Sequence, residues 1–159
     1  MKAEIKLKAP HEYSCARRAL FFILQISFFI LILMILGLGT DICGIERVAR
    51  YLERYGERFT RRCFTPDEIA YCERYSNRAE QYAARIAAKE AASKALGTGW
   101  RRGVHWKCFE VASQHSGKPF LRIHGRAAEI ASEMGVRHTQ VSLTHDAGVA
   151  LAVVIFEGA

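Results

Sequence analysis

Two segments of this chain carry residue types that suit binding of a metal ion and a phosphate group. The first runs from Arg85 to Gly99 and is rich in alanine, the strongest helix former. Glu90 and Lys94 stand four residues apart in it, so a carboxylate and an ammonium lie side by side on the predicted helix. Gly97 suits the helix end, where a positive φ is needed. A phosphate could meet Lys94 directly and Glu90 through a metal. The alternative is a surface helix with one ordinary ion pair, worth roughly 0.3–0.5 kcal/mol.

The second segment ends in Asp41. Residues 34–42 are apolar apart from a short glycine-rich stretch and are predicted to form a buried strand. A carboxylate in such surroundings is costly to bury unless a positive group meets it. Asp41 and Glu90 together would suit Mg²⁺, which prefers oxygen ligands and leaves room for substrate phosphates and water. The alternative is that Asp41 caps a helix that begins near Gly44.

Arginine recurs at spacings of three and four after this strand, which places one basic stripe on a helix. Apolar residues follow the same period on another side, as an amphipathic helix requires: Ile45, Val48, Leu52, Tyr55 and Phe59. From Arg47 to Arg62 six arginines face two glutamates, a net charge of +4 that equals the excess of the whole chain from Met34 onward. The stripe is either a solvated face or a docking surface for an acidic partner, whose association its field would accelerate.

The C-terminal half predicts short strands joined by turns. The ranges are strands at 108–113, 120–124, 139–144 and 149–156, a turn at 114–119, and a helix at 126–134 that ends at Gly135. Together with the helices before them, these elements predict an α+β fold, in which helices pack on a largely antiparallel sheet.

Length and composition narrow the class of protein. The 159 residues suit one domain, and half of them are hydrophobic. The five cysteines are odd in number, scattered and without a CxxC pair, which favours reduced thiols in the cytoplasm and gives no zinc-binding spacing. The pI near 9.4 would also suit a nucleic-acid-binding module, but acidic residues alternate with the arginines and no aromatic-basic stacking motif is present.

The motifs, taken in order, resemble holo-acyl-carrier-protein synthase, a family of the 4′-phosphopantetheinyl transferase superfamily. The resemblance covers residues 34 to about 157 and rests on five motifs: Gly37-x-Gly39-Thr40-Asp41-Ile42 with Arg47, Phe64-Thr65-Pro66-x-Glu68, Arg85 to Gly99, Gly117-Lys118-Pro119 and Ser142-Leu143-Thr144-His145. It implies the transfer of the 4′-phosphopantetheine arm of coenzyme A to a serine of apo-acyl carrier protein, a step of fatty acid biosynthesis and lipid metabolism. The second product is adenosine 3′,5′-bisphosphate, and the usual metal is magnesium.

The resemblance also implies roles for individual residues. Asp41 and Glu90 match metal ligands, and Glu90, Lys94 and His145 match the catalytic positions. Glu90 and His145 both stay candidates for accepting the serine proton. The family further implies a homotrimer with active sites at subunit boundaries. Contact with coenzyme A is implied for Arg85, Lys94, Gly97, Thr98 and Gly99, and carrier-protein docking for Arg47, joined by Arg50 and Arg54 on the basic stripe.

Residues 1–33 have no counterpart in the family pattern. Residues 19–38 form a largely apolar run preceded by basic residues, as in a membrane anchor. The first strand of the family would occupy the end of that run. The favoured interpretation is therefore that the translation start is misassigned and that translation begins at Met34. The transferase domain would then span residues 34–159. A membrane anchor is the second interpretation. The competing function is a membrane-tethered, non-enzymatic binder of an acidic protein.

Overall fold

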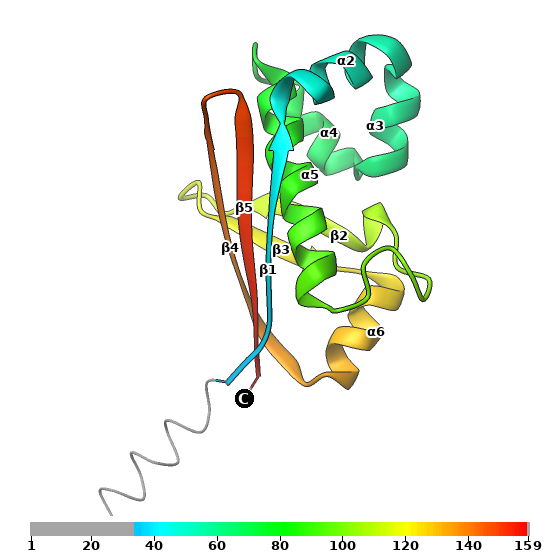
Figure 1. The fold of residues 1–159 in the computed structure, drawn as a ribbon, viewed down its shortest axis with the longest axis vertical. Coiled ribbons are helices and arrows are strands. Elements are labelled where there is room, and N and C mark those ends of the chain that lie inside the picture. The colour runs from blue at the N-terminus through cyan, green and yellow to red at the C-terminus, as the bar shows by residue number, and fades with distance from the viewer. Residues whose placement is uncertain (1–33, 159) are drawn as a thin grey trace, which may run out of the picture. The chain divides into compact units, whose positions relative to one another are not determined.

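The computed structural model describes residues 34–158, so the expectations for residues 1–33 lie outside the described part (Figure 1). The elements are, in order, β1 (Met34–Gly44), α2 (Ile45–Tyr55), α3 (Glu57–Cys63), α4 (Pro66–Cys72), α5 (Arg78–Ala95), the 3-10 helix η1 (Trp106–Cys108), β2 (Phe109–Ser113), β3 (Pro119–Ile123), α6 (Gly125–Glu133), β4 (Val136–Asp146) and β5 (Val149–Gly158). None of the helices within residues 34–158 combines the length and the apolar character that a membrane crossing requires.

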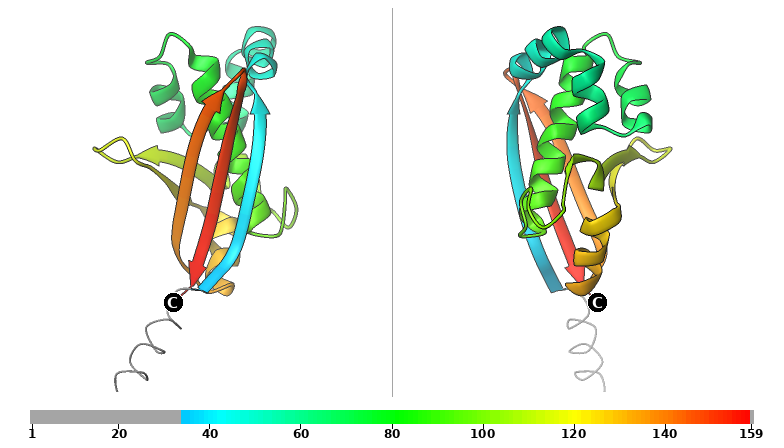
Figure 2. Two further views of the ribbon diagram at one scale, coloured as in Figure 1. Left: turned by 60° about the vertical axis from the view of Figure 1, so that its left-hand side comes forward. Right: turned by 90° about the vertical axis from the view of Figure 1, so that its right-hand side faces the viewer.

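The strands form two antiparallel sheets, which confirms the predicted α+β fold. A three-stranded sheet has the order β1-β5-β4, and β2 pairs with β3 in a separate hairpin. Helix α5 crosses one face of the three-stranded sheet, as the right view of Figure 2 shows. The core lies between that face and α5, because alternate residues of β5 from Ala150 to Phe156 are fully buried there. The other face carries no helix in the left view of Figure 2.

The prediction that residues 34–42 form a buried strand is wrong in its burial. The strand exists, but Leu38 is 62% exposed and Ile42 58%. Successive side chains of a strand point to opposite faces, so the glycines and Asp41 face α5 while Leu38 and Ile42 lie on the uncovered face. An apolar run indicated a strand correctly, but it could not tell how many layers would cover that strand.

The predicted single arginine helix is also wrong, because it is divided at Gly56. This residue has φ = +50° and ends α2, and α3 begins directly after it. Arg47, Arg50 and Arg54 therefore lie on α2, whereas the arginines from position 58 onward lie on α3. Tyr55, expected on the apolar side, is 46% exposed beside this turn.

Helix α4 begins with a capping box. The Thr65 hydroxyl accepts a hydrogen bond from the backbone N–H of Glu68 at 3.3 Å, and the Glu68 carboxylate accepts one from the backbone N–H of Thr65 at 2.9 Å. Pro66 fits the first helical position, where no N–H partner is needed. This arrangement satisfies two N-terminal donors and brings the Glu68 carboxylate into the core.

Glu68 also forms a fully buried ion pair with Lys89 of α5. The Nζ–Oε2 distance is 2.7 Å and neither side chain is exposed. Lys89 Nζ donates further hydrogen bonds to the carbonyl oxygens of Trp106 at 3.1 Å and Phe109 at 2.6 Å, and Glu68 accepts one from the backbone N–H of Val111 at 3.0 Å. Burial lowers the pKa of Lys89, and the negative charge of Glu68 counteracts that effect. The pair thereby joins α4, α5 and β2 in one network.

We expect Lys89→Met to lower the free energy of unfolding by about 3–5 kcal/mol, because it leaves the buried Glu68 carboxylate unpaired. Urea unfolding followed by circular dichroism measures the change. Adding Glu68→Gln to this variant removes the unpaired charge and should recover part of the loss. Lys94→Met is the control, because this lysine is half exposed and its ion pair contributes about 1 kcal/mol or less. Equal losses at positions 89 and 94 would contradict the role of the buried pair.

Candidate active site

The two glycines of β1 set the distance between this strand and α5. A methyl group built at Gly39 would overlap the carbonyl oxygen of Ala91, and one at Gly37 would overlap that of Ala95. Both obstacles are helix backbone, which cannot move aside as a flexible side chain would. Only glycine permits this approach, and it brings the end of β1 against the C-terminal half of α5.

Asp41 meets a positive group at this contact, as its burial required. Lys94 Nζ lies 2.8 Å from Asp41 Oδ1 and donates a second hydrogen bond to the carbonyl oxygen of Thr40 at 2.9 Å. Asp41 does not cap α2, because the N-cap residue is Gly44 and no side chain bonds the helix start. Lys94 pairs with Asp41 of the strand and not with Glu90, so the ordinary ion pair within the helix that the alternative required is not formed. The alternative of a surface helix is wrong too, since most of α5 is buried.

Glu90 lies one turn before Lys94, and its carboxylate Oε2 accepts a hydrogen bond from Trp100 Nε1 at 3.0 Å. The pKa of the Cys43 thiol is affected by both predicted metal ligands. Burial raises the pKa of this thiol, Arg47 counteracts the increase, and the negative charges of Asp41 and Glu90 add to it. Both carboxylates therefore act on the same buried sulfur on the helix-facing side of β1.

The donor set fits a magnesium ion. Each carboxylate uses one oxygen in the contacts above, Asp41 Oδ1 with Lys94 and Glu90 Oε2 with Trp100, and within residues 34–158 the second oxygen of each accepts no hydrogen bond. Within residues 34–158 no group of three His, Cys, Asp or Glu side chains could hold a metal on its own. An ion held by these two carboxylates would need further oxygens from a substrate or from water, which is how proteins commonly bind Mg²⁺.

The loop after α5 folds back onto the helix end. Gly97 has φ = +74°, which confirms the positive φ predicted at the helix end, and Gly99 has φ = +53°. Their backbone N–H groups donate to the carbonyl oxygens of Lys94 at 2.9 Å and Ser93 at 3.2 Å. Thr98 is buried between them. The loop therefore packs on the backbone of the last turn of α5, directly after Lys94 in the chain.

Arg85 and His145 lie apart from this centre. Arg85 is buried, its guanidinium stands 4.1 Å from the centre of the Tyr71 ring, and its Nε has no hydrogen-bond partner among the described residues. Tyr71 lines a surface pocket of about 420 Å³ between α4 and the β2–β3 hairpin. His145 lies on β4, and its Nε2 stands 3.7 Å from Oε2 of Glu80 on α5. Strand β5 separates β4 from β1, a gap of roughly 10 Å, so one chain does not bring His145 to Asp41.

The arginines of α2 lie on an exposed surface together with aromatic rings. Arg47, Arg50 and Arg54 are exposed, and Arg54 stands 5.2 Å from the centre of the Tyr55 ring. We call this surface the basic-aromatic face. It continues onto α3 through a pocket of about 330 Å³, and its members are Arg47, Arg50, Tyr51, Arg54, Tyr55, Arg58, Phe59 and Arg62.

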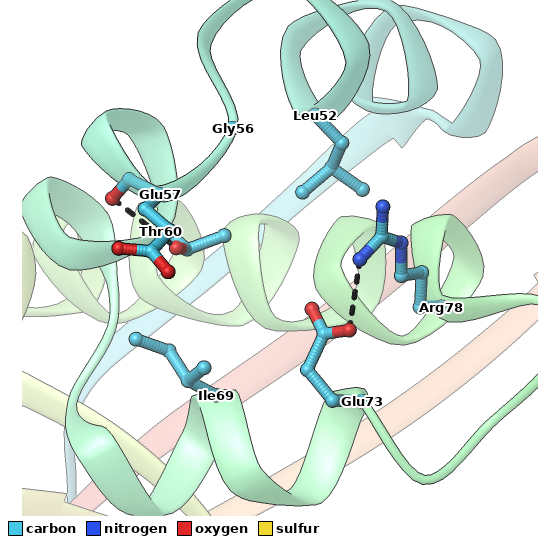
Figure 3. Close-up of a pocket in the computed structure, with 7 residues that line it drawn as sticks. All are labelled: Leu52, Gly56, Glu57, Thr60, Ile69, Glu73 and Arg78. Atoms are coloured by element: carbon cyan, nitrogen blue, oxygen red, sulfur yellow. Dashed lines mark hydrogen bonds and ion pairs between the residues drawn. The ribbon is translucent and has the colours of Figure 1, made fainter.

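A further pocket of about 380 Å³ lies among α2, α3, α4 and α5 (Figure 3). Glu73 points into it and accepts hydrogen bonds from Arg78 and from the hydroxyl of Tyr82, each at 2.8 Å. Burial opposes ionisation of Glu73, but these two donors outweigh it and lower its pKa. The charges in this pocket thus satisfy one another and connect α4 to α5, which indicates a structural role.

Sequence reasoning missed Trp100, Tyr71 and the pairing of Glu68 with Lys89. The Thr-x-x-Glu capping box was a readable signal for Glu68. No sequence signal placed the indole of Trp100 on Glu90, because that contact depends on how the loop folds back over α5.

Comparison with known proteins agrees with this geometry. A family profile described as the 4′-phosphopantetheinyl transferase superfamily matches residues 37–154. The chain belongs to this superfamily, which confirms the assignment predicted from the five motifs.

Within the superfamily the chain is similar to holo-[acyl-carrier-protein] synthases. The one from Solibacter usitatus is 52% identical over 124 residues, which cover 78% of this chain and 99% of that protein. The crystal structure of the enzyme from Neisseria meningitidis matches with a TM-score of 0.70 and 32% identity, over 77% of this chain and 98% of the other. The Helicobacter pylori enzyme in complex with coenzyme A matches with a TM-score of 0.67 and 28% identity, over 75% and 98% of the two chains. These relatives favour the enzyme over the alternative of a non-enzymatic binder.

Proposed function

We propose that this chain transfers the 4′-phosphopantetheine moiety of coenzyme A to a serine of apo-acyl carrier protein at a centre formed by Asp41, Glu90 and Lys94. The observation that carries the proposal is the 2.8 Å contact between Lys94 and Asp41, which joins the end of β1 to α5. We place the reaction in the cytoplasm, where coenzyme A and carrier proteins occur.

Asp41 and Glu90 would hold magnesium. The bound ion would stabilise the negative charge on the pyrophosphate oxygens. The serine oxygen attacks one phosphorus of the pyrophosphate, and the bond from that phosphorus to the bridging oxygen breaks. Lys94 already donates to Asp41 and Thr40, so its third N–H would donate to the leaving phosphate, and adenosine 3′,5′-bisphosphate departs. Glu90 is the candidate for accepting the serine proton. His145 is the rival, and it would act from a neighbouring subunit because it is distant within one chain.

We place the nucleotide end of coenzyme A in the pocket beside Tyr71. Arg74 and Arg122 line it together with Asp67 and Glu110, and Arg122 is paired with Glu110 at 2.7 Å. Arg85 lies against the Tyr71 ring, and its Nε–H has no hydrogen-bond partner among the described residues. Cationic side chains favour phosphate groups, and the half-buried Tyr71 ring offers its free edge and face to a base. We assign Arg85 to this end of the substrate, and Gly97, Thr98 and Gly99 to the pyrophosphate end.

Asp41→Asn tests the metal site. We expect kcat/KM to fall more than about 100-fold, since even residues that only support a ligand change metal affinity 10–100-fold. The magnesium concentration for half-maximal rate should rise. The carrier's gain in mass, followed across magnesium concentrations, measures both quantities. Asp146→Asn is the matched control, because Asp146 is exposed and bonds the neighbouring backbone N–H. Wild-type turnover in Asp41→Asn would remove Asp41 from the mechanism.

The basic-aromatic face supports docking of the carrier protein. Its arginines are exposed, and Tyr51 and Tyr55 add apolar surface that is 41% and 46% exposed. Acyl carrier proteins are small and acidic, so complementary charge would steer their approach. Arg47 connects this face to the centre, because its guanidinium donates to Cys43 Sγ at 3.6 Å.

Arg50→Glu combined with Arg54→Glu should raise the KM for carrier protein about tenfold or more, which corresponds to about 1.4 kcal/mol. The KM for coenzyme A should hardly change. Steady-state kinetics with each substrate varied in turn measures both constants. Lys107→Glu with Arg137→Glu makes the same change in net charge at exposed positions outside the face. Equal effects on both substrates, or an equal effect of the control pair, would exclude docking at this face.

We also propose that the chain assembles as a homotrimer through the uncovered face of the three-stranded sheet. Leu38 and Ile42 are largely exposed there, and neighbouring residues of β5 are only half-buried. A contiguous apolar surface of this kind typically marks an interface between subunits. Because β1 and β4 are the edge strands of this sheet, such an assembly would place the edges that carry Asp41 and His145 next to a second subunit.

Leu38→Glu combined with Ile42→Glu should shift the mass of the full-length protein from three chains toward one, because charges on this face oppose its burial. Light scattering coupled to size-exclusion chromatography measures the mass. Tyr75→Glu changes an exposed side chain on the helical side and serves as the control. A monomeric wild-type protein would contradict the trimer, and an unchanged mass in the double variant would place the interface elsewhere.

A further inference from the structure

We propose that Trp100 is a positioning residue that fixes the Glu90 carboxylate for cation binding, an inference that rests on the proposed metal-binding role of Glu90. Trp100 lies outside the five motifs that indicated the site. Its indole Nε1 donates a hydrogen bond of 3.0 Å to Glu90 Oε2. It is the side-chain donor that the structure places on this carboxylate, while the neighbouring ammonium of Lys94 is directed at Asp41.

The indole ring is held in place by other aromatic rings. Its centre lies 4.2 Å from that of Trp106, with an angle of 32° between the planes, and 6.3 Å from that of Phe109. The backbone carbonyls of Trp106 and Phe109 both accept hydrogen bonds from the buried Lys89 ammonium. The partners of Trp100 are therefore tied to the residue that precedes Glu90 on the same helix.

This arrangement has a consequence for the carboxylate. An indole N–H is only a donor, and it can occupy one oxygen of Glu90 without offering a competing ligand. The carboxylate is thereby oriented, with Oε2 bound and Oε1 available to a cation. A glutamate that rotates freely would lose side-chain entropy on binding the ion, whereas one already fixed by Trp100 loses less. Residues that orient a metal ligand typically affect metal affinity 10–100-fold.

Trp100→Phe tests the inference, because phenylalanine keeps an aromatic ring for stacking and removes the N–H donor. We expect the magnesium concentration for half-maximal rate to rise about 10–100-fold, with little change in the KM for carrier protein. Trp106→Phe is the matched control. It also removes one indole from the stack, but it leaves the bond from Trp100 to Glu90 intact, so its magnesium dependence should stay near that of the wild type.

Fluorescence gives a readout that is independent of activity. The chain has two tryptophans, so Trp100 is the sole indole in Trp106→Phe. Magnesium added in the presence of coenzyme A should change the Trp100 emission, with the same midpoint as the rate, and Glu90→Gln in this background should abolish the change. This fluorescence experiment tests the positioning role of Trp100 even if Trp100→Phe fails to fold.

The inference is overturned if Trp100→Phe and Trp106→Phe shift the magnesium dependence equally, or if Trp100 emission does not respond to magnesium. Failure of the proposed function looks different. Wild-type turnover in Glu90→Gln would remove Glu90 from the centre, whatever the result at position 100. Full loss of turnover in Glu90→Gln, together with an unchanged magnesium dependence in Trp100→Phe, would support the proposed function and reject the positioning role of Trp100.

Discussion

The close contact between the backbones of β1 and α5 is the constraint on which the rest of the site depends. At Gly37 and Gly39 the strand lies against helix carbonyl oxygens, at a distance that leaves no room for a Cβ atom. This packing allows Lys94 to reach both the side chain of Asp41 and the carbonyl oxygen of Thr40. A strand held farther away by side chains would separate these groups and leave the Asp41 carboxylate without the ammonium that offsets its burial.

The rotation of α5 about its own axis is fixed by a second interaction, the buried pair of Lys89 with Glu68. Successive residues of a helix point about 100° apart. Because Lys89 points into the core, the next residue, Glu90, points to the border between the buried and the exposed side of α5. Glu90 is accordingly half-buried and accessible to Trp100. The buried charges thus do more than join α4, α5 and β2, because they determine which side of α5 presents the Glu90 carboxylate.

The sequence predicted the local elements well and their partners less well. Alanine density located α5, the glycine motif located β1, and alternating patterns located the hairpins, since each is encoded within one segment. The errors all concerned contacts between segments. The pairing of Lys94 with Asp41, the exposure of Leu38 and the bond of Trp100 to Glu90 each depend on which element packs against which. Gly56 is the exception, because a glycine inside an apolar period was a local signal of the break between α2 and α3.

The exposed sheet face and the separation of Asp41 from His145 have a common origin in the strand order. With β5 between β1 and β4, the strands that carry Asp41 and His145 form opposite edges of the sheet. One helix covers one face, so the other face keeps Leu38 and Ile42 in contact with solvent. If subunits associate through that face, the contact would bury the apolar side chains and would place the sheet edges that carry Asp41 and His145 beside a neighbouring subunit. Assembly and activity would then depend on one surface, and a change that weakens the interface would reduce turnover without altering Asp41, Glu90 or Lys94.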